Sequence, residues 1–254
     1  MLKWCSYCQQ FMGEVPDYDD LLITHGTCRE CHPATFRSAK LDLTHARFLK
    51  GVQRKLWNAG RASDLKVAES TIDDAVTAGL RPIDVLMGMI APMLYQVGED
   101  WKRGVLDVEG EHQFTSFCER VLDLIGTKSK LGLSADGKSG GEILLMNAFG
   151  NRHTLAVRVL ALWLKSKGRR TEIVDAQRDT DPLLSHIRTK QPKLLLISMA
   201  LSEQYGGVNE LAERIAELPE PVRPRVVVGG YAVKLGLVPP IQGADMMADI
   251  SLLQ

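Results

Sequence analysis

Two pairs of cysteines near the N-terminus have the spacing of a metal site. Each pair is a Cys-x-x-Cys motif, and nineteen residues separate the two pairs, which are Cys5 with Cys8 and Cys28 with Cys31. One such motif can direct two sulfurs to the same ion, and four thiolates form the closed tetrahedral site typical of structural zinc. His25 and His32 are close enough in sequence for one of them to replace a cysteine, and reactive or incidental thiols are the alternative. We expect a structural zinc site without catalytic chemistry.

A single histidine, His153, has the position of a ligand in the second half of the chain. It follows the apolar run 143–146, which is typical of a buried strand, and precedes the segment 155–167, which has helical periodicity. In a parallel α/β sheet such a loop lies at the carboxyl end of a strand, where ligands bind. The start of a helix carries partial positive charge, which keeps imidazole neutral and able to bind a metal. Capping of its own helix is the alternative role for His153.

Two more predicted strands end in small or polar residues. Ser198 follows the apolar strand 194–197, and Gly229 and Gly230 close the strand 226–228. In a parallel sheet these positions share one edge with the loop of His153. The pattern predicts that another group approaches the backbone closely at this edge.

The three strand ends together resemble the cobalamin-binding, Rossmann-like domain of methionine synthases, corrinoid proteins and B12-dependent photoreceptors. The motif of that domain is Asp-x-His-x-x-Gly, then Ser-x-Leu, then Gly-Gly, and the spacing here is similar. This chain departs from the motif at Asn151, Ala156 and Ala200, which replace Asp, Gly and Leu. The resemblance implies that His153 is the lower axial ligand of cobalt. Asn151 would accept a hydrogen bond from the second ring nitrogen, since metal-bound histidines need such a partner.

The same resemblance implies where the rest of the cofactor lies. The nucleotide tail of the cobalamin would enter a cleft lined by Ser198, Gly229 and Gly230. The cofactor would be adenosylcobalamin or methylcobalamin. A haem or a bilin bound to the same fold is the alternative, and the replacements at Asn151 and Ala156 are its support.

The segment between the cysteines and the predicted sheet is rich in helix formers. Glycines and Pro82 divide it into four predicted helices, at about 41–59, 62–79, 82–103 and 107–128. Apolar residues recur at helical spacing, which is typical of the core of a helical bundle. Pro92 falls inside the third helix, and we expect it to kink or split that helix.

The junction of the third and fourth predicted helices carries an indole and an acid–imidazole pair. Trp101 precedes Glu111 and His112 with nine residues between the indole and the acid. A core tryptophan with a surface pair is one interpretation. The pattern also resembles the helical cap of B12-dependent photoreceptors of the CarH type. That resemblance implies that Trp101 packs against the upper face of the cofactor and that Glu111 and His112 border the same pocket. Lys102 stands where the light-adapted photoreceptor has a histidine ligand.

Composition narrows the class of protein. The chain is 45% hydrophobic and 24% charged with a formal net charge of zero, so it is typical of a globular protein and offers no basic face for nucleic acid. It has no run long enough to span a membrane and no signal-peptide core, so we expect a cytoplasmic protein with reduced thiols. Cys118 is expected to be a buried apolar residue.

We therefore predict a multidomain protein, with a small zinc module and an all-α four-helix bundle before an α/β doubly wound parallel sheet of the flavodoxin-like or Rossmann-like kind. Five strands are predicted, at about 142–147, 171–174, 194–198, 225–228 and 245–249. The expected parts are a zinc-ribbon-like module (1–37), a helical cap (38–130), a linker (131–141) and a cobalamin-binding domain (142–254).

The resemblances imply a cobalamin-binding sensory or regulatory protein, with light as one candidate signal. The zinc module resembles those appended to bacterial signalling proteins. Without a helix-turn-helix region, signalling or transcription regulation would pass to a protein partner, or act through a homo-oligomer. The alternative is a corrinoid carrier that shuttles methyl groups between methyltransferases. On this interpretation the chain is an enzyme component, whereas a sensor is not an enzyme.

Overall fold

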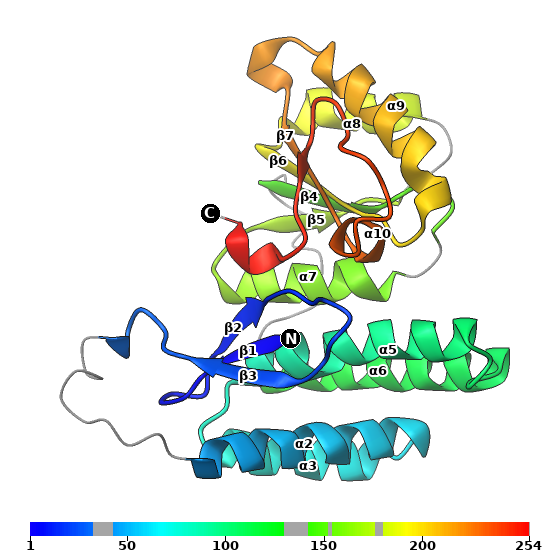
Figure 1. The fold of residues 1–254 in the computed structure, drawn as a ribbon. Helices are drawn as coiled ribbons and strands as arrows, with labels where there is room; N and C mark the ends of the chain where they lie inside the picture. Colours follow the sequence, from blue (N-terminus) through cyan, green and yellow to red (C-terminus); the bar gives the residue numbers. More distant parts are fainter. Residues whose placement is uncertain (33–42, 130–141, 152–153, 176–179, 254) are drawn as a thin grey trace. The chain divides into compact units, whose positions relative to one another are not determined.

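The computed structural model describes residues 1–32, 43–129, 142–151, 154–175 and 180–253. The chain divides into two compact units, Met1–Gly132 and Leu133–Gln254, which are described separately (Figure 1). No described helix is long and apolar enough to cross a membrane.

A small three-stranded sheet begins the first unit. Its strands are β1 (Leu2–Cys5), β2 (Phe11–Glu14) and β3 (Ile23–Gly26), in the order β2-β1-β3. Strand β1 is antiparallel to β2 and parallel to β3. Leu2 and Trp4 are fully buried, while Lys3 between them is half-buried. Side chains of a strand alternate between its two faces, so one face of this sheet packs on a core.

Helices follow the sheet within the same unit. They are α2 (Leu43–Arg61), α3 (Leu65–Thr77), α4 (Pro82–Val85), the π-helical turn η1 (Leu86–Ile90), α5 (Ala91–Lys102) and α6 (Val108–Lys128). The segments α4, η1 and α5 follow one another without a break and form the predicted third helix. Its wide turn η1 ends two residues before Pro92, whose nitrogen has no N–H to donate and whose ring would clash in a regular helix. The predicted disturbance at this proline is therefore a π turn.

Local polar groups fix where these helices begin, and aromatic side chains join them. The carboxylate of Asp64 accepts a hydrogen bond from the backbone N–H of Val67 at the start of α3, and Asp107 caps α6 in the same way. The rings of Trp57 and Phe114, from α2 and α6, have centroids 5.2 Å apart. The largest fully buried helical side chains are Leu49, Leu56, Ile72, Leu86, Met89, Ile90, Phe117, Leu122 and Ile125.

The N-terminal sheet shares this core. A Cβ atom placed on Gly88 of η1 would lie 2.3 Å from the Trp4 ring and 2.6 Å from the Phe11 ring, so both rings pack directly on the helix backbone. Strand β2 contacts η1, and β3 contacts α2. A short segment cannot by itself bury an indole, and no sequence pattern indicated that the helices would do so. The sheet and the helices therefore form one unit.

The second unit is built on a parallel sheet with helices on both faces. Its elements are β4 (Ile143–Asn147), α7 (Leu155–Ser166), β5 (Thr171–Ile173), α8 (Thr180–Lys190), β6 (Leu194–Ser198), the 3-10 turn η2 (Ser202–Gln204), α9 (Tyr205–Ala216), the 3-10 turn η3 (Glu220–Val222), β7 (Arg225–Gly229), α10 (Tyr231–Lys234), β8 (Asp245–Met246) and the 3-10 turn η4 (Ile250–Leu252). The strand order is β5-β4-β6-β7-β8, and every neighbouring pair is parallel. This order is flavodoxin-like, as predicted.

Two apolar clusters show why this sheet is stable. Residues of α8 and α9, among them Leu184 and Leu211, pack on one face of the sheet. Val157 and Ala161 of α7 pack on the other face. All five residues of β4 are buried, as expected for a central parallel strand covered on both sides. The polar atoms of such a sheet are accessible at the strand ends.

Candidate functional site

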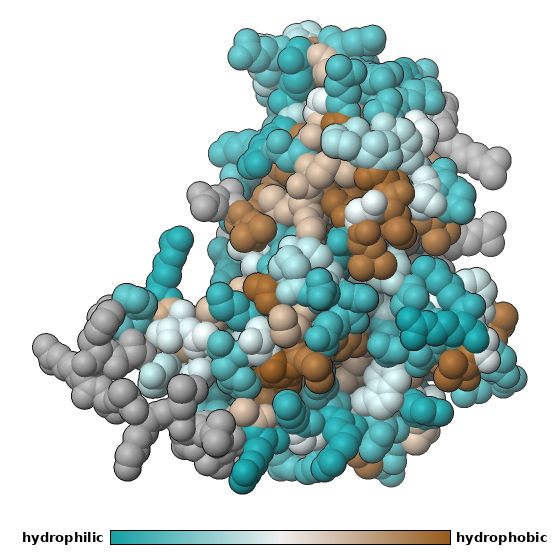
Figure 2. Space-filling model, viewed as in Figure 1, coloured by the Kyte–Doolittle hydropathy of each residue, from teal (hydrophilic) through white to brown (hydrophobic). Residues whose placement is uncertain are grey.

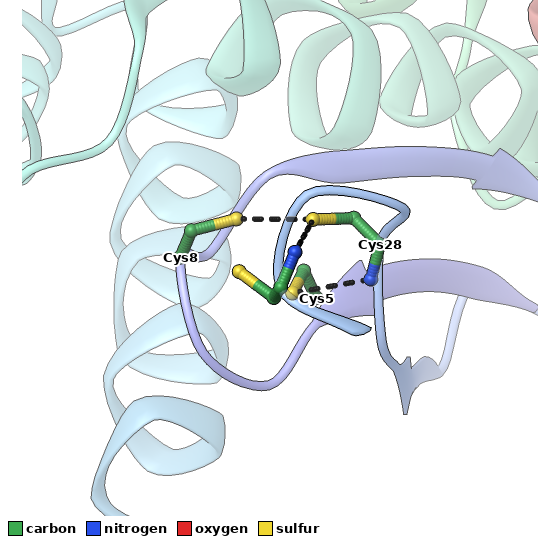
Figure 3. Close-up of side chains that lie close together, drawn as sticks. Cys5, Cys8 and Cys28 are labelled. Atoms are coloured by element: carbon green, nitrogen blue, oxygen red, sulfur yellow. Dashed lines mark hydrogen bonds between the residues drawn. The ribbon is translucent and has the colours of Figure 1, made fainter. Parts of the chain in front are cut away.

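The four N-terminal cysteines converge on one point. Their sulfur atoms all lie within 4.8 Å of one another, and the Sγ atoms of Cys8 and Cys28 are 3.7 Å apart (Figure 3). Zinc bound to four thiolates at about 2.3 Å in a tetrahedron holds its sulfurs about 3.8 Å apart. The donor set and the spacing therefore fit a structural zinc ion.

The pairing of the strands explains this convergence. Strands β1 and β3 are parallel neighbours in which Cys5 is paired with Gly26, so both strands run into their cysteine turns at the same edge of the sheet. The backbone N–H of Cys28 donates to the Cys5 sulfur at 3.5 Å, and that of Cys31 donates to the Cys28 sulfur at 3.4 Å. Such donors stabilise thiolates, which are the form that binds metal.

Without a bound cation, the clustered thiols favour a state with a single thiolate. Burial alone would raise the pKa of Cys5, but hydrogen bonds from the backbone N–H groups of Cys8, Cys28 and Tyr7 lower it to about 6. Burial raises the pKa of Cys8, and the neighbouring thiols raise it further. One thiolate thus forms readily, while further thiolates are disfavoured until a cation compensates their charge.

The histidines near this cluster are not part of it. Among the described residues, the four cysteines form the group whose ligand atoms are close enough to share a metal ion. His25 lies on β3, and burial lowers the pKa of its imidazole. The cluster therefore favours the four-cysteine set over the predicted alternative in which His25 or His32 replaces a cysteine.

Three strand ends lie side by side in the second unit. Asn147 of β4 is paired with Ser198 of β6, and Ser198 is paired with Gly229 of β7. The side chain of Ser198 is half-buried at this edge. The loops that carry the predicted cofactor residues therefore leave the sheet at adjacent positions, as the sequence indicated.

Backbone atoms of neighbouring loops lie close to Gly229 and Gly230, where the sequence predicted a close approach. Gly230 has a φ of 101°, and a Cβ atom there would lie 2.5 Å from the carbonyl oxygen of Met199. A Cβ atom on Gly229 would lie 2.9 Å from the carbonyl oxygen of Met247. The glycines thus hold neighbouring loops against the strand end whether or not a cofactor is bound. Their predicted contact with a nucleotide tail stays a prediction.

The histidine loop is described only in part. His153 lies outside the described residues. Asn151 is half-buried, and its backbone N–H donates to the carbonyl of Ala148 at 3.0 Å. Ala156 is exposed in the first turn of α7, so its methyl group is at the surface. The roles of His153 as the cobalt ligand and of Asn151 as its hydrogen-bond partner remain predictions.

The indole and the acid–imidazole pair lie at the junction of α5 and α6. Trp101 is 48% exposed near the end of α5, so it is not a core residue of the helical unit. In the first turns of α6, the Nε2 atom of His112 lies 3.4 Å from an Oε atom of Glu111. The hydroxyl of Thr115 donates to the same carboxylate at 2.8 Å. The pair therefore belongs to a small polar network near the exposed indole.

Two valines extend the apolar surface around Trp101. Val105 is 64% exposed and Val108 is 54% exposed. Hydrophobic residues are visible at this end of the helices in Figure 2. The sequence analysis missed both valines, although apolar residues in a turn and at a helix start are a recognisable signal. Together with Trp101, these exposed valines are candidates for a binding surface.

Comparison with known families decides between the open interpretations of these two units. Residues 52–125, in the helical unit, match a family described as a B12 binding domain, and residues 141–236 match a second family with the same description. The chain belongs to the B12-binding proteins. Its helical cap and Rossmann-like domain are the two domains of this class, in the predicted order. No significant match is found among curated proteins.

Solved structures that match this chain at low identity include corrinoid and cobalamin-binding proteins. The monomethylamine corrinoid protein of Methanosarcina barkeri is 16% identical, with a TM-score of 0.61 over 78% of this chain and 92% of that one. The methanol:cobalamin methyltransferase complex of the same organism is 16% identical over 79% and 77%, with a TM-score of 0.37. A cobalamin-binding protein of Desulfitobacterium hafniense DCB-2 is 13% identical over 79% and 93%, with a TM-score of 0.40. At this level of identity the first likeness shows the architecture of the B12-binding protein and not its reaction.

Proposed function

We propose that this B12-binding protein is regulatory, and that its bound cobalamin controls its association with a protein partner. The observation that carries the proposal is the combination of a helical B12-binding domain with a four-cysteine module in one compact unit. A closed four-thiolate site is structural, so this module adds a docking or control element to the cofactor domain and no chemistry of its own.

The residues present suit the cofactor at the lower edge of the proposed site. His153, two residues before α7, is the proposed cobalt ligand, with Asn151 as the partner of its second ring nitrogen. Ser198 and the backbone near Gly229 offer a hydroxyl and peptide groups at adjacent strand ends, which suit the polar nucleotide tail. Adenosylcobalamin or methylcobalamin supplies a cleavable cobalt–carbon bond when bound.

The exposed indole suits the apolar side of a cofactor. Covering the exposed half of Trp101 would remove on the order of 100 Å² of mostly apolar surface from water, which stabilises the covered state by about 2–3 kcal/mol. Cleavage of the cobalt–carbon bond at the upper face of the cobalamin would alter the surface against which Trp101 packs. A difference in these contacts between two states is what a regulatory protein needs, because a ligand shifts an equilibrium only through differential contacts.

Light is one candidate signal for this regulation. Lys102 directly follows Trp101, and its ammonium group donates to Glu99 at 3.0 Å. A lysine held in this way does not reproduce the histidine ligand of the light-adapted CarH-type photoreceptors. A light response would therefore have to use a different upper ligand. Any regulation of transcription would pass through the protein partner.

A corrinoid carrier of a methyltransferase system is the second candidate. It is favoured by the fold shared with the monomethylamine corrinoid protein, which this chain covers over 92% of its length. In that case the partners would be methyltransferases, and the protein would be a component of an enzyme system. The neutral amide of Asn151 would then have to replace the acid that the family motif has beside the ligand.

Visible spectroscopy of the protein loaded with adenosylcobalamin tests the proposal. We expect a spectrum of histidine-coordinated cobalamin for the wild type, and its loss in His153→Ala. The matched control is His186→Ala, because His186 is paired with Glu172 at 2.9 Å elsewhere in the same unit. The proposal fails if His153→Ala retains histidine coordination. Retention of haem or a bilin in place of cobalamin would also refute it.

Two further measurements separate the candidates. A spectral change on illumination, together with a change in oligomeric state or partner binding, supports the regulatory function. Transfer of the methyl group from methylcobalamin on this protein to the nucleophilic substrate of an added methyltransferase, which leaves cob(I)alamin on the protein, supports the carrier if the association state does not change.

A further inference from the structure

Apolar contacts join the four-cysteine module to the helix that carries Trp101 in its last turn. Strand β1 places Trp4 and β2 places Phe11 against Gly88, in the π turn of the α4–η1–α5 helix. The two rings meet each other edge to face with centroids 5.4 Å apart. Trp4 is fully buried by this contact. Trp4 directly precedes the ligand Cys5, so the metal site and the apolar contact share one strand.

Polar contacts tie the same module to the helices. The Nδ1 atom of His45 in α2 lies 3.0 Å from the carbonyl oxygen of Ser6, inside the first Cys-x-x-Cys turn. Gln53 of the same helix donates to the carbonyl of Leu21 at 3.3 Å. These bonds attach both the first cysteine turn and the loop before β3 to α2.

An ion pair lies at the start of the α4–η1–α5 helix. Arg81 at its N-cap forms a bidentate ion pair with Asp84, with N–O distances of 2.7 and 2.8 Å. This pair fixes the first turn of the helix whose π turn contacts the module.

From these contacts we propose that metal binding by the four cysteines controls the order of the α4–η1–α5 helix. The module acts as a metal-dependent clamp on this helix. The clamp holds the helix at Gly88, and Trp101 lies thirteen residues further on, about 20 Å along the axis. The inference goes beyond the proposed function, since it concerns the helical unit without cobalamin.

The short strands explain why the clamp would depend on metal. Strands β1, β2 and β3 have four residues each, and a segment this short buries too little apolar surface to be stable without a metal or a packing partner. A zinc ion held by the four cysteines would join the turns that follow β1 and β3. Loosening of β1 would withdraw Trp4 from Gly88 and expose the π turn to water.

Hydrogen exchange with mass spectrometry on the full, cobalamin-free chain tests the clamp. We expect chelation of zinc to lower the protection of the amides in Leu86–Lys102 by tenfold or more, and added zinc to restore it. Strand β6 (Leu194–Ser198) in the second unit is the internal reference and should not change. Loss of protection confined to residues 1–32 would overturn the proposal, as would failure of zinc to restore protection in 86–102.

Two glycine substitutions in the same helix provide a matched pair. The new methyl group of Gly88→Ala would overlap the Trp4 and Phe11 rings, whereas nothing lies within 4 Å of a Cβ atom at Gly98. We expect Gly88→Ala to bind zinc but to lose most of the zinc-dependent protection of 86–102. Gly98→Ala should keep it. The proposal is wrong if both variants respond to zinc like the wild type. The chelation experiment on the wild type needs neither variant to fold.

Discussion

Gly230 offers a sharp test of how the cofactor edge of the sheet is built. Its φ of 101° and ψ of −176° lie in a backbone region that is essentially restricted to glycine. A Cβ atom there would meet three backbone atoms of Met199, at 2.5, 2.8 and 3.0 Å. Met199 cannot retreat easily, because its N–H donates to Gly229 and its carbonyl accepts from Ala232. Gly230→Ala therefore combines backbone strain with an overlap that side-chain motion cannot relieve.

A control glycine separates these two effects. Gly150, in the loop after β4, also has a positive φ, of 82°, but nothing lies within 4 Å of a Cβ atom at this position. Backbone strain alone predicts a loss of about 1–2 kcal/mol for Gly150→Ala. For Gly230→Ala the strain of about 1–3 kcal/mol and an overlap of similar size predict a loss of about 3 kcal/mol or more.

Native-state hydrogen exchange of β6 and β7 at increasing urea concentrations measures both losses in the second unit, without cobalamin. A difference of 1.4 kcal/mol between the variants corresponds to a tenfold difference in exchange through global unfolding. If Gly230→Ala is no more destabilising than Gly150→Ala, the contact with Met199 does not explain why residue 230 is a glycine. Its conformation would then serve the bound cofactor and not the fold.

Three further predictions concern the first unit. Cys8→Ser should reduce bound zinc from about one ion per chain to a small fraction of that, by metal analysis, because three sulfurs leave the tetrahedron open; full retention would exclude a four-sulfur site. In the zinc-free chain, the free energy of unfolding should fall as the pH drops below the ordinary pKa of 6.5, because burial lowers the pKa of His25 in the folded state and the unfolded chain then binds more protons. Denaturation at several pH values should show that the free energy of unfolding depends less on pH for His25→Gln. An unchanged pH dependence would mean that another group causes the fall. Trp101→Ala should change the unfolding free energy by less than about 1 kcal/mol but weaken cobalamin binding at least tenfold in a titration, since the indole is half exposed; the reverse pattern would make Trp101 a core residue.

The sequence was a good guide wherever one local signal decided the structure. The apolar run at β6 ends at Ser198 as predicted, because a strand buried on both faces needs continuous apolar residues. Asp107 and Pro82 mark helix starts through their own capping and backbone chemistry. The four cysteines meet because the spacing within each Cys-x-x-Cys motif lets two sulfurs reach the same ion.

Contacts between distant segments could not be predicted in this way. Nothing in the sequence around Gly88 indicates that the Trp4 ring lies against it, because the pair depends on how a sheet docks on a helix. The Met199 backbone atoms that lie against Gly230 were likewise not predicted, because they come from a different loop. A glycine in a sequence indicates that something is close, but only the fold shows what it is.

The contact at Gly88 also bears on how a B12-binding cap could acquire control by metal. A helix interrupted by a π turn has weaker local hydrogen bonding at that point, so its order depends more on what packs there. In this chain the packing comes from Trp4 and Phe11, on strands that adjoin the cysteine turns. The π turn, whose order depends most on what packs against it, thus contacts the strands that adjoin the cysteine turns. The C-terminal end of the same helix carries the half-exposed Trp101. Any effect of zinc on cobalamin affinity should therefore be reduced in Gly88→Ala and unchanged in Gly98→Ala, which titration of the two variants with and without zinc would establish.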